Sequence, residues 1–222
     1  ATLNKKRIET REALGIGPDD KVILYAVSWD SYLYKTLSAE QILAVITEAL
    51  HCVAHQFIKS DSSKSNKSSR IWLFLKYHPY PTREPAFDMS RFQYPLDRFL
   101  PLRDNGYEIR LTKDLSTGLI VADCFLSHES TTLTEAIQHG VPTVSLDYCQ
   151  ATGEPTLGTG TYKISRSHRF ISIHETAEAI GDNINDLLRA SPIDSYRDCL
   201  LAWSNIYDFG RTEGLMRIIS ES

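Results

Sequence analysis

Short apolar runs recur along the chain and are separated by segments in which apolar residues follow the helical period. A strand that reads as continuously apolar is typical of a parallel sheet that is covered on both faces. The runs predict strands at residues 22–27, 71–75, 107–111, 124–126 and 143–146.

The intervening segments predict helices. Gly15 and Gly17-Pro18 end the first of them, and Ser38 is in place to cap the second. Strands that alternate with helices predict an α/β fold, a Rossmann-like open and mostly parallel sheet with helices on both faces. We expect one domain over residues 1–222, with helices at 4–14, 38–58, 114–122, 132–139, 175–189, 193–207 and 212–219.

Composition narrows the class of protein. The chain has 222 residues, 42% hydrophobic and 23% charged, as in ordinary globular proteins. Residues 1–111 hold 16 basic and 13 acidic side chains and residues 112–222 hold 8 and 15, so neither half has the basic excess of a general nucleic-acid binder. The Ser/Lys/Asn tract at 60–69 predicts a mobile surface loop.

The sequence also bears on location. Uncharged stretches such as 136–146 fall far short of the roughly 18 apolar residues of a membrane span, and no signal peptide opens the chain. The four cysteines are scattered and favour free thiols over a disulfide framework. These features predict a cytoplasmic protein.

Polar residues follow the second predicted strand, where ligands of open α/β sheets bind. His78 lies in the segment Lys76-Tyr77-His78-Pro79, and Pro79 restricts the backbone there to an extended turn. The imidazole could donate a hydrogen bond or a charge to a phosphate oxygen. The alternative is a surface histidine in a proline-rich loop.

A second polar cluster follows the fourth predicted strand. Ser130, Thr131 and Thr132 are consecutive hydroxyl residues at a predicted helix start, a combination that suits an anion. Thr132 and Glu135 also have the spacing of a capping box, so the hydroxyls could serve only as caps. Gly140-Val141-Pro142 is expected to end this helix.

A third cluster lies near the end of the chain. Asp208 and Gly210 predict a turn, and Arg211 beside it could grip a phosphate with two hydrogen bonds. The alternative is a solvated arginine.

Separately, Glu48, His51 and His55 have helical spacing that could suit a metal. No fourth ligand is evident, and a position on the helix surface is the better interpretation.

Taken in order, these motifs resemble the C-terminal half of the GT-B transferases, in particular the CDP-glycerol glycerophosphotransferases and the capsule or surface-polysaccharide glycosyltransferases. The resemblance implies one half of a GT-B fold that binds a nucleotide-activated donor, either a nucleotide sugar or a CDP-glycerol-type compound. The residues that carry it are Tyr25-Ala26, Lys76-Tyr77-His78-Pro79, Ser130-Thr131-Thr132 with Glu135-Ala136, Gly140-Val141-Pro142 and Asp208-x-Gly210-Arg211.

The resemblance also implies roles. It gives His78 a catalytic part, places Lys76, Ser130, Thr131 and Thr132 at the donor phosphates, and puts Glu135 at a ribose hydroxyl or in a cap. It adds the turn with Asp208, Gly210 and Arg211 to the same donor site, with no metal and no cofactor besides the donor.

By the same resemblance, residues 1–17 are a linker helix between two domains, residues 191–222 are C-terminal helices, and the acceptor-binding N-terminal domain is missing. The chain is then a fragment of an enzyme of polysaccharide synthesis, whose peripheral association with the inner face of a membrane stays open. Two alternatives remain: a non-catalytic nucleotide-sugar-binding module, and a sugar-nucleotide 2-epimerase, which shares the GT-B fold but carries a Ser-Gly-Gly turn where this chain has Ser130-Thr131-Thr132.

Overall fold

The structure is a computed structural model. The described residues are 2–27, 39–61, 69–77, 96–112, 114–128, 132–147, 168–172, 175–190, 194–199 and 201.

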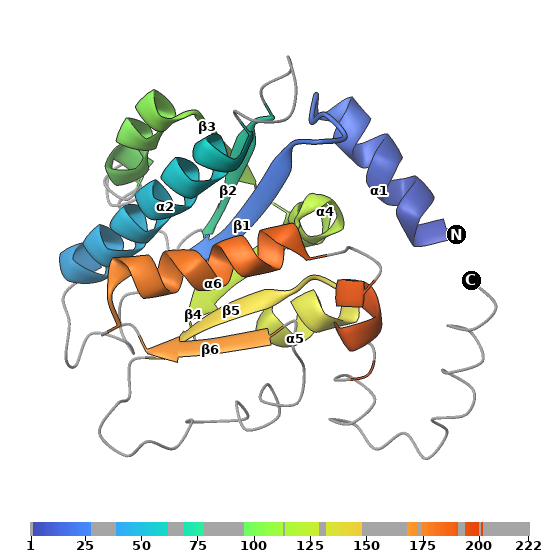
Figure 1. Cartoon of the computed structure of the whole chain (residues 1–222). Coiled ribbons are helices and arrows are strands. Elements are labelled where there is room, and N and C mark those ends of the chain that lie inside the picture. The colour runs from blue at the N-terminus through green and yellow to red at the C-terminus, as the bar shows by residue number, and fades with distance from the viewer. Residues whose placement is uncertain are drawn as a thin grey trace, which may run out of the picture.

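A six-stranded sheet forms the centre of the molecule (Figure 1). Every neighbouring pair of strands is parallel, and the spatial order is β3-β2-β1-β4-β5-β6. This is the doubly wound order of a Rossmann-like sheet, in which β1 and β4 lie side by side at the point where the order reverses. The fold class predicted from the sequence is therefore confirmed. The strands are β1 (Lys21–Val27), β2 (Ile71–Tyr77), β3 (Tyr107–Thr112), β4 (Cys124–His128), β5 (Thr143–Asp147) and β6 (His168–Ser172).

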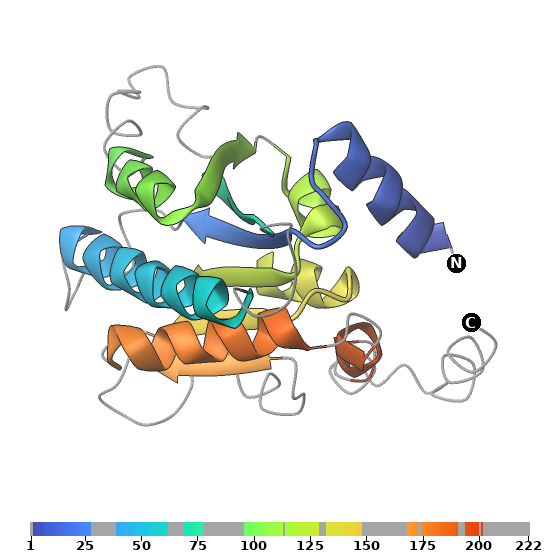
Figure 2. The ribbon, with the colours of Figure 1, turned by 45° about the horizontal axis from the view of Figure 1, so that its top comes forward.

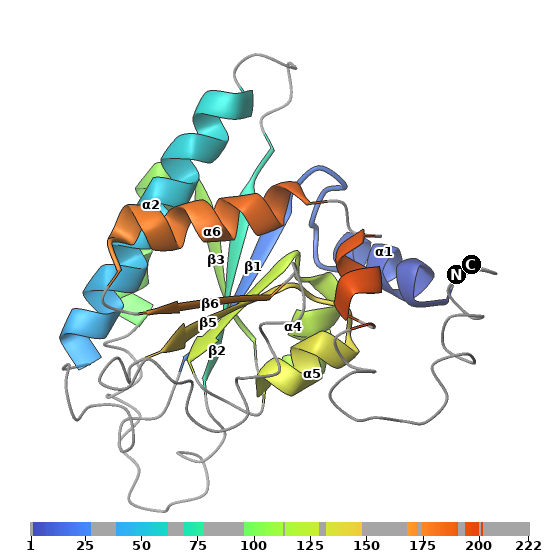
Figure 3. The same ribbon diagram turned by 60° about the horizontal axis from the view of Figure 1, so that its bottom comes forward.

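Helices cover both faces of the sheet, as Figure 3 shows. One face packs against α2 (Ala39–Asp61), α6 (Ala177–Arg189) and the 3-10 helix η2 (Leu100–Asn105), with α2 and α6 running side by side (Figure 2). The other face packs against α4 (Leu115–Val121) and α5 (Thr132–Gln138), and α1 (Thr2–Ala13) lies against α4. Each face has its own apolar core, because side chains alternate between the two faces along every strand.

The elements differ from the prediction at β6, at the end of α2 and at the helical segment 96–105, which includes η2 and is not among the predicted helices. The sequence analysis did not predict β6, because its residues His168-Arg169-Phe170-Ile171-Ser172 are too polar to read as a buried strand, which an edge position permits. Helix α2 continues to Asp61, so the first two residues of the tract at 60–69 are helical and not loop. No glycine or proline stands there to end the helix earlier. Residues 62–68 and 212–219 lie outside the described part of the chain.

One carboxylate, Asp123, joins β4 to β1 at the amino ends of the strands. The Asp123 amide donates to the carbonyl of Val22 at 2.8 Å, and Asp123 Oδ2 accepts from the Val22 amide at 2.8 Å. The same carboxylate forms ion pairs with Arg7 at 2.8 Å and Arg11 at 3.2 Å. Because the group is largely buried, its charge needs these cationic partners.

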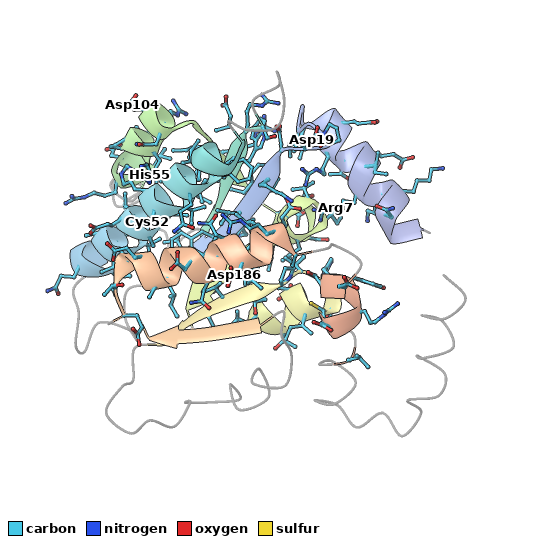
Figure 4. All side chains as sticks on the ribbon, in the orientation of Figure 1. Arg7, Asp19, Cys52, His55, Asp104 and Asp186 are labelled. Atoms are coloured by element: carbon cyan, nitrogen blue, oxygen red, sulfur yellow. The ribbon has the colours of Figure 1, made fainter. Side chains whose placement is uncertain are left out.

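The two arginines also satisfy the end of α4. Arg7 donates to the carbonyls of Ile120 and Ala122, and Arg11 donates to that of Val121. The last carbonyls of a helix have no partner within it and carry partial negative charge, so guanidinium groups suit them. Arg7 thus reaches from α1 toward α4 (Figure 4), and α1 is fastened to the sheet. A linker role for residues 1–17 stays a prediction.

A second carboxylate, Asp20, joins β1 to β2 at the same edge. Its Oδ1 accepts from the Arg70 amide at 3.0 Å, and its Oδ2 accepts from the Gly17 amide, the Arg70 guanidinium and the Trp72 indole, each at 2.9 Å. The Arg70 guanidinium also lies 5.0 Å from the centre of the Trp72 ring. Burial by itself would raise the pKa of Asp20, but the donated hydrogen bonds outweigh it and the pKa is lowered.

We predict that Asp20→Asn lowers the free energy of unfolding by about 1.5–3 kcal/mol near neutral pH, because an amide can accept at only one of the two oxygen positions. The pKa of Asp20 is lower in the folded than in the unfolded state, so its contribution is complete above the unfolded value and is lost as the pH falls through the folded one. Denaturant titrations at several pH values should therefore show a smaller acid loss in the variant. The exposed neighbour Asp19, changed to asparagine, is the control, and equal effects of both variants would contradict the prediction.

The predicted helix end at Gly140 is confirmed and is sterically tight. Gly140 has φ +70°, and a Cβ built on it would lie 2.1 Å from Cδ2 of Tyr196, in the helical segment 194–199. Gly106 has φ +83° with nothing within 4 Å of such a Cβ.

Alanine substitutions at Gly106 and Gly140 distinguish the cost of backbone strain from the cost of steric crowding. Gly106→Ala should cost about 1 kcal/mol of unfolding free energy from strain alone, and Gly140→Ala about 1–3 kcal/mol more, because the ring of Tyr196 must move. Thermal or denaturant unfolding of the two variants measures the difference. Equal losses would show that Tyr196 yields without cost.

Candidate functional site

The carboxyl ends of the six parallel strands share one edge of the sheet. The strand order reverses between β1 and β4, because β2 lies beside β1 on one side and β5 lies beside β4 on the other. The crevice at such a reversal is where open α/β sheets bind their ligands. The candidate site is therefore the edge at Val27, at the end of β1, and His128, at the end of β4.

A polar row crosses the sheet one position before this edge. Its members are paired in register on the face that packs against α4 and α5: Thr112 on β3, Lys76 on β2, Ala26 on β1, Ser127 on β4 and Ser145 on β5. Two residues earlier, the same face holds buried Phe74, Leu24 and Phe125. On this face, large apolar side chains fill the middle of the sheet, and small or polar side chains lie next to the switch point.

Lys76 brings a cation to this row, and its predicted contact with a donor phosphate stays a prediction. Its side chain is half-buried, and burial lowers the pKa of its ammonium, while the nearby carboxylate of Asp114 opposes that shift. Two strand spacings of about 5 Å each separate β2 from β4, so Lys76 stands roughly 10 Å from the start of the β4–α5 segment.

Asp114 is a site residue that the sequence analysis did not single out. It is the N-cap of α4 and accepts from the amides of Ser116 at 3.1 Å and Thr117 at 3.0 Å. The hydrogen bonds from the Thr117 hydroxyl and amide, with Lys76 as a weaker cause, lower the pKa of Asp114. An aspartate before a helical stretch signals a cap; that it also faces Lys76 follows from the pairing of β2 with β3.

Ser127 and Ser145 are a second feature that the sequence analysis did not assign. They are register partners on β4 and β5 and each is 1% exposed. Within the described part of the chain, these two hydroxyl groups are the buried side-chain oxygens without a hydrogen-bond partner.

Helix α5 begins directly after the candidate site. Thr132 is its first residue, so this threonine lies inside the helix and does not precede it as the cap of a capping box with Glu135. Glu135 is exposed and lies in the first turn. Leu133, Ala136 and Ile137 form its buried side.

The remaining predicted site residues fall outside the described residues: His78, Ser130, Thr131, Asp208, Gly210 and Arg211. Their roles stay predictions, and of the predicted set the described residues include Lys76 on β2 and Thr132 and Glu135 on α5.

A groove of about 840 Å³ lies elsewhere, between α2 and η2, and is lined by Glu48, His51, Cys52 and His55 among others. His55 and Cys52 both project from α2 (Figure 4). Across the described residues, no group of three or more metal-ligating side chains gathers, in this groove or at the sheet edge. Nor does any helix in the described segments have the length and apolar character to cross a membrane.

The sequence and the structure were compared with those of known proteins. No protein-family model and no curated protein matches the sequence. Solved structures do match: MurG of Acinetobacter baumannii (TM-score 0.55, 12% identity, 97% of this chain and 53% of that one) and WaaG, a glycosyltransferase involved in lipopolysaccharide biosynthesis (TM-score 0.52, 13% identity, 97% and 51%). The chain has a Rossmann-like fold of the GT-B type.

A glycosyltransferase from Rickettsia africae is similar to the same extent, with TM-score 0.51, 14% identity and coverage of 98% of this chain and 52% of that one. The chain thus spans about half the length of each of these structures. The ends of β1 and β4 lie at the edge where a Rossmann-like domain binds its ligand.

The pairing of Lys76 with Asp114 can be tested without a ligand. Asp114→Asn keeps an oxygen to cap α4 but removes the charge, so the pKa of Lys76 should fall further below its ordinary value while unfolding free energy changes little. Titration of the lysine side-chain signals by NMR measures the shift. Asp104→Asn, at an exposed carboxylate on η2, is the control, and an unchanged Lys76 pKa would show that Asp114 does not act on it.

Proposed function

We propose that this chain is the donor-binding domain of a nucleotide-dependent glycosyltransferase or glycerophosphotransferase of cell-surface polysaccharide synthesis. The observation that carries the proposal is the half-buried ammonium of Lys76 in a polar row at the switch point of a GT-B-type sheet. In our proposal the phosphates of a nucleoside diphosphate meet Lys76 of β2 on one side and the start of α5 on the other.

The chemistry follows from charge. Transfer from a nucleotide donor breaks the bond between the transferred group and a phosphate oxygen, and negative charge develops on that phosphate. A cation in a partly desolvated site stabilises such charge more strongly than one in water. Lys76 supplies a fixed positive charge, and in our proposal His78 adds a donor close to the leaving phosphate while Ser130, Thr131 and Thr132 add hydroxyls.

Similarity to solved structures supports the class of ligand. An Escherichia coli structure named for trehalose-6-phosphate has UDP-2-fluoro glucose bound and matches with TM-score 0.55 at 8% identity, over 100% of this chain and 47% of that one. In our proposal the donor is a substrate of the same kind, held without a metal. An acceptor-binding domain, on a further segment or a partner, would complete the enzyme.

We predict that Lys76→Ala weakens binding of CDP or UDP by roughly ten- to hundredfold, the loss expected for a hydrogen bond to a charged group. His78→Ala should act in the same direction, added salt should weaken binding, and EDTA should have no effect. Calorimetry with CMP, CDP, UDP and GDP measures these changes and identifies the base.

Lys21→Ala is the matched control, because Lys21 carries the same charge at the amino end of β1, the opposite edge of the sheet. If Lys21→Ala and Lys76→Ala weaken nucleotide binding equally, the loss of affinity comes from the change in net charge and not from a contact of Lys76. Loss of binding with EDTA, or no binding of any of the four nucleotides, would contradict the proposed function.

A further inference from the structure

The buried hydroxyl pair of Ser127 and Ser145 calls for a hydrogen-bond partner. Each side chain is 1% exposed, and the two residues face the same side of the sheet as direct register partners on neighbouring parallel strands. The described side chains and backbone offer neither hydroxyl a partner, and the two do not bond to each other. Buried hydroxyls in folded proteins are as a rule satisfied, by protein or by ordered water.

The geometry of a parallel sheet fits one bridging molecule. Neighbouring strands lie about 5 Å apart, and a hydroxyl–water hydrogen bond spans about 2.8 Å, so a water between the two side chains reaches both oxygens. Small side chains belong to the same face, because Ala26 is the register partner of Ser127 in this row and Ala136 of α5 is part of the core there. Two hydroxyls also meet the minimum of two polar partners for a buried water.

We propose that Ser127 and Ser145 form a binding site for a single buried water, which joins the carboxyl ends of β4 and β5 beneath α5. The bridge lies one residue before His128 and two before Asp147, so it fixes the strand ends that lead into the switch-point edge. If the proposed function holds, the two serines are positioning residues for the donor site: they act on its shape and touch no ligand.

The sign of a serine-to-alanine effect tests the bridge. Ser127→Ala and Ser145→Ala should each lower the folding equilibrium constant by roughly five- to hundredfold. Each substitution removes a hydroxyl that is hydrogen-bonded to the water and leaves the other hydroxyl without its bridging partner. The double variant should lose clearly less than the product of the two single losses, since it leaves an apolar site. Ser116→Ala, at an exposed serine of α4, is the control and should change nothing.

Two outcomes would overturn the proposal. If the hydroxyls have no partner, each single substitution raises stability by removing a buried unsatisfied group; if their partners are separate, the losses multiply without coupling. A crystal structure that orders water molecules decides the matter even where a variant does not fold. Electron density within hydrogen-bond distance of both oxygens supports the bridge, and a direct contact between the hydroxyls excludes it.

Nucleotide binding separates this proposal from the proposed function. With the bridge present, Ser127→Ala should weaken CDP or UDP binding several-fold, and Ser116→Ala should not. If the wild-type chain binds no nucleotide, the proposed function fails while the unfolding and crystallographic results still decide whether the water bridge exists. If nucleotide binds but Ser127→Ala leaves affinity unchanged, the positioning role is wrong.

Discussion

The arrangement of the sheet depends on the carboxylate of Asp123. Asp123 stands at the amino end of β4, where its amide donates to the Val22 carbonyl of β1 and its carboxylate accepts from the Val22 amide. Arg7 and Arg11 neutralise the carboxylate. This contact sets β4 beside β1, with Cys124 opposite Ile23, and so fixes the place where the strand order reverses. The same register determines which residues lie side by side at the carboxyl ends of β1 and β4, where the candidate site is.

Helix α4 connects the two edges. Its last carbonyls are held by Arg7 and Arg11 at the amino edge, and its first turn is capped by Asp114 beside Lys76 at the carboxyl edge. A seven-residue helix is not stable by itself in water, so these end contacts and its packing decide whether it forms. The anchoring of α1 and the charge environment of Lys76 are therefore parts of one structural unit.

Strand runs, helix ends and the fold class could be predicted from the sequence because they follow from local apolar patterns and from glycines such as Gly140. The polar edge strand β6 could not, since it lacks such a pattern. Lys76 could be found because it follows the apolar run at 71–75, although β2 continues through it to Tyr77. Ser127 and Ser145, 18 positions apart in the sequence, become a pair only through the register of β4 and β5, which no local signal contains. The proximity of Asp114 to Lys76 likewise depends on the pairing of β2 with β3.

The burial of β1 has a consequence for the motions of the domain. Val22, Ile23 and Leu24 are fully buried, and β1 is hydrogen-bonded to β2 on one side and β4 on the other. Amide hydrogens in such a strand exchange with solvent only when the whole domain opens, whereas β3 and β6, each paired on one side, exchange through smaller local openings. The slowest-exchanging amides should therefore lie beside the switch point. A ligand that binds at this edge therefore meets, in β1, a backbone that moves only with global unfolding.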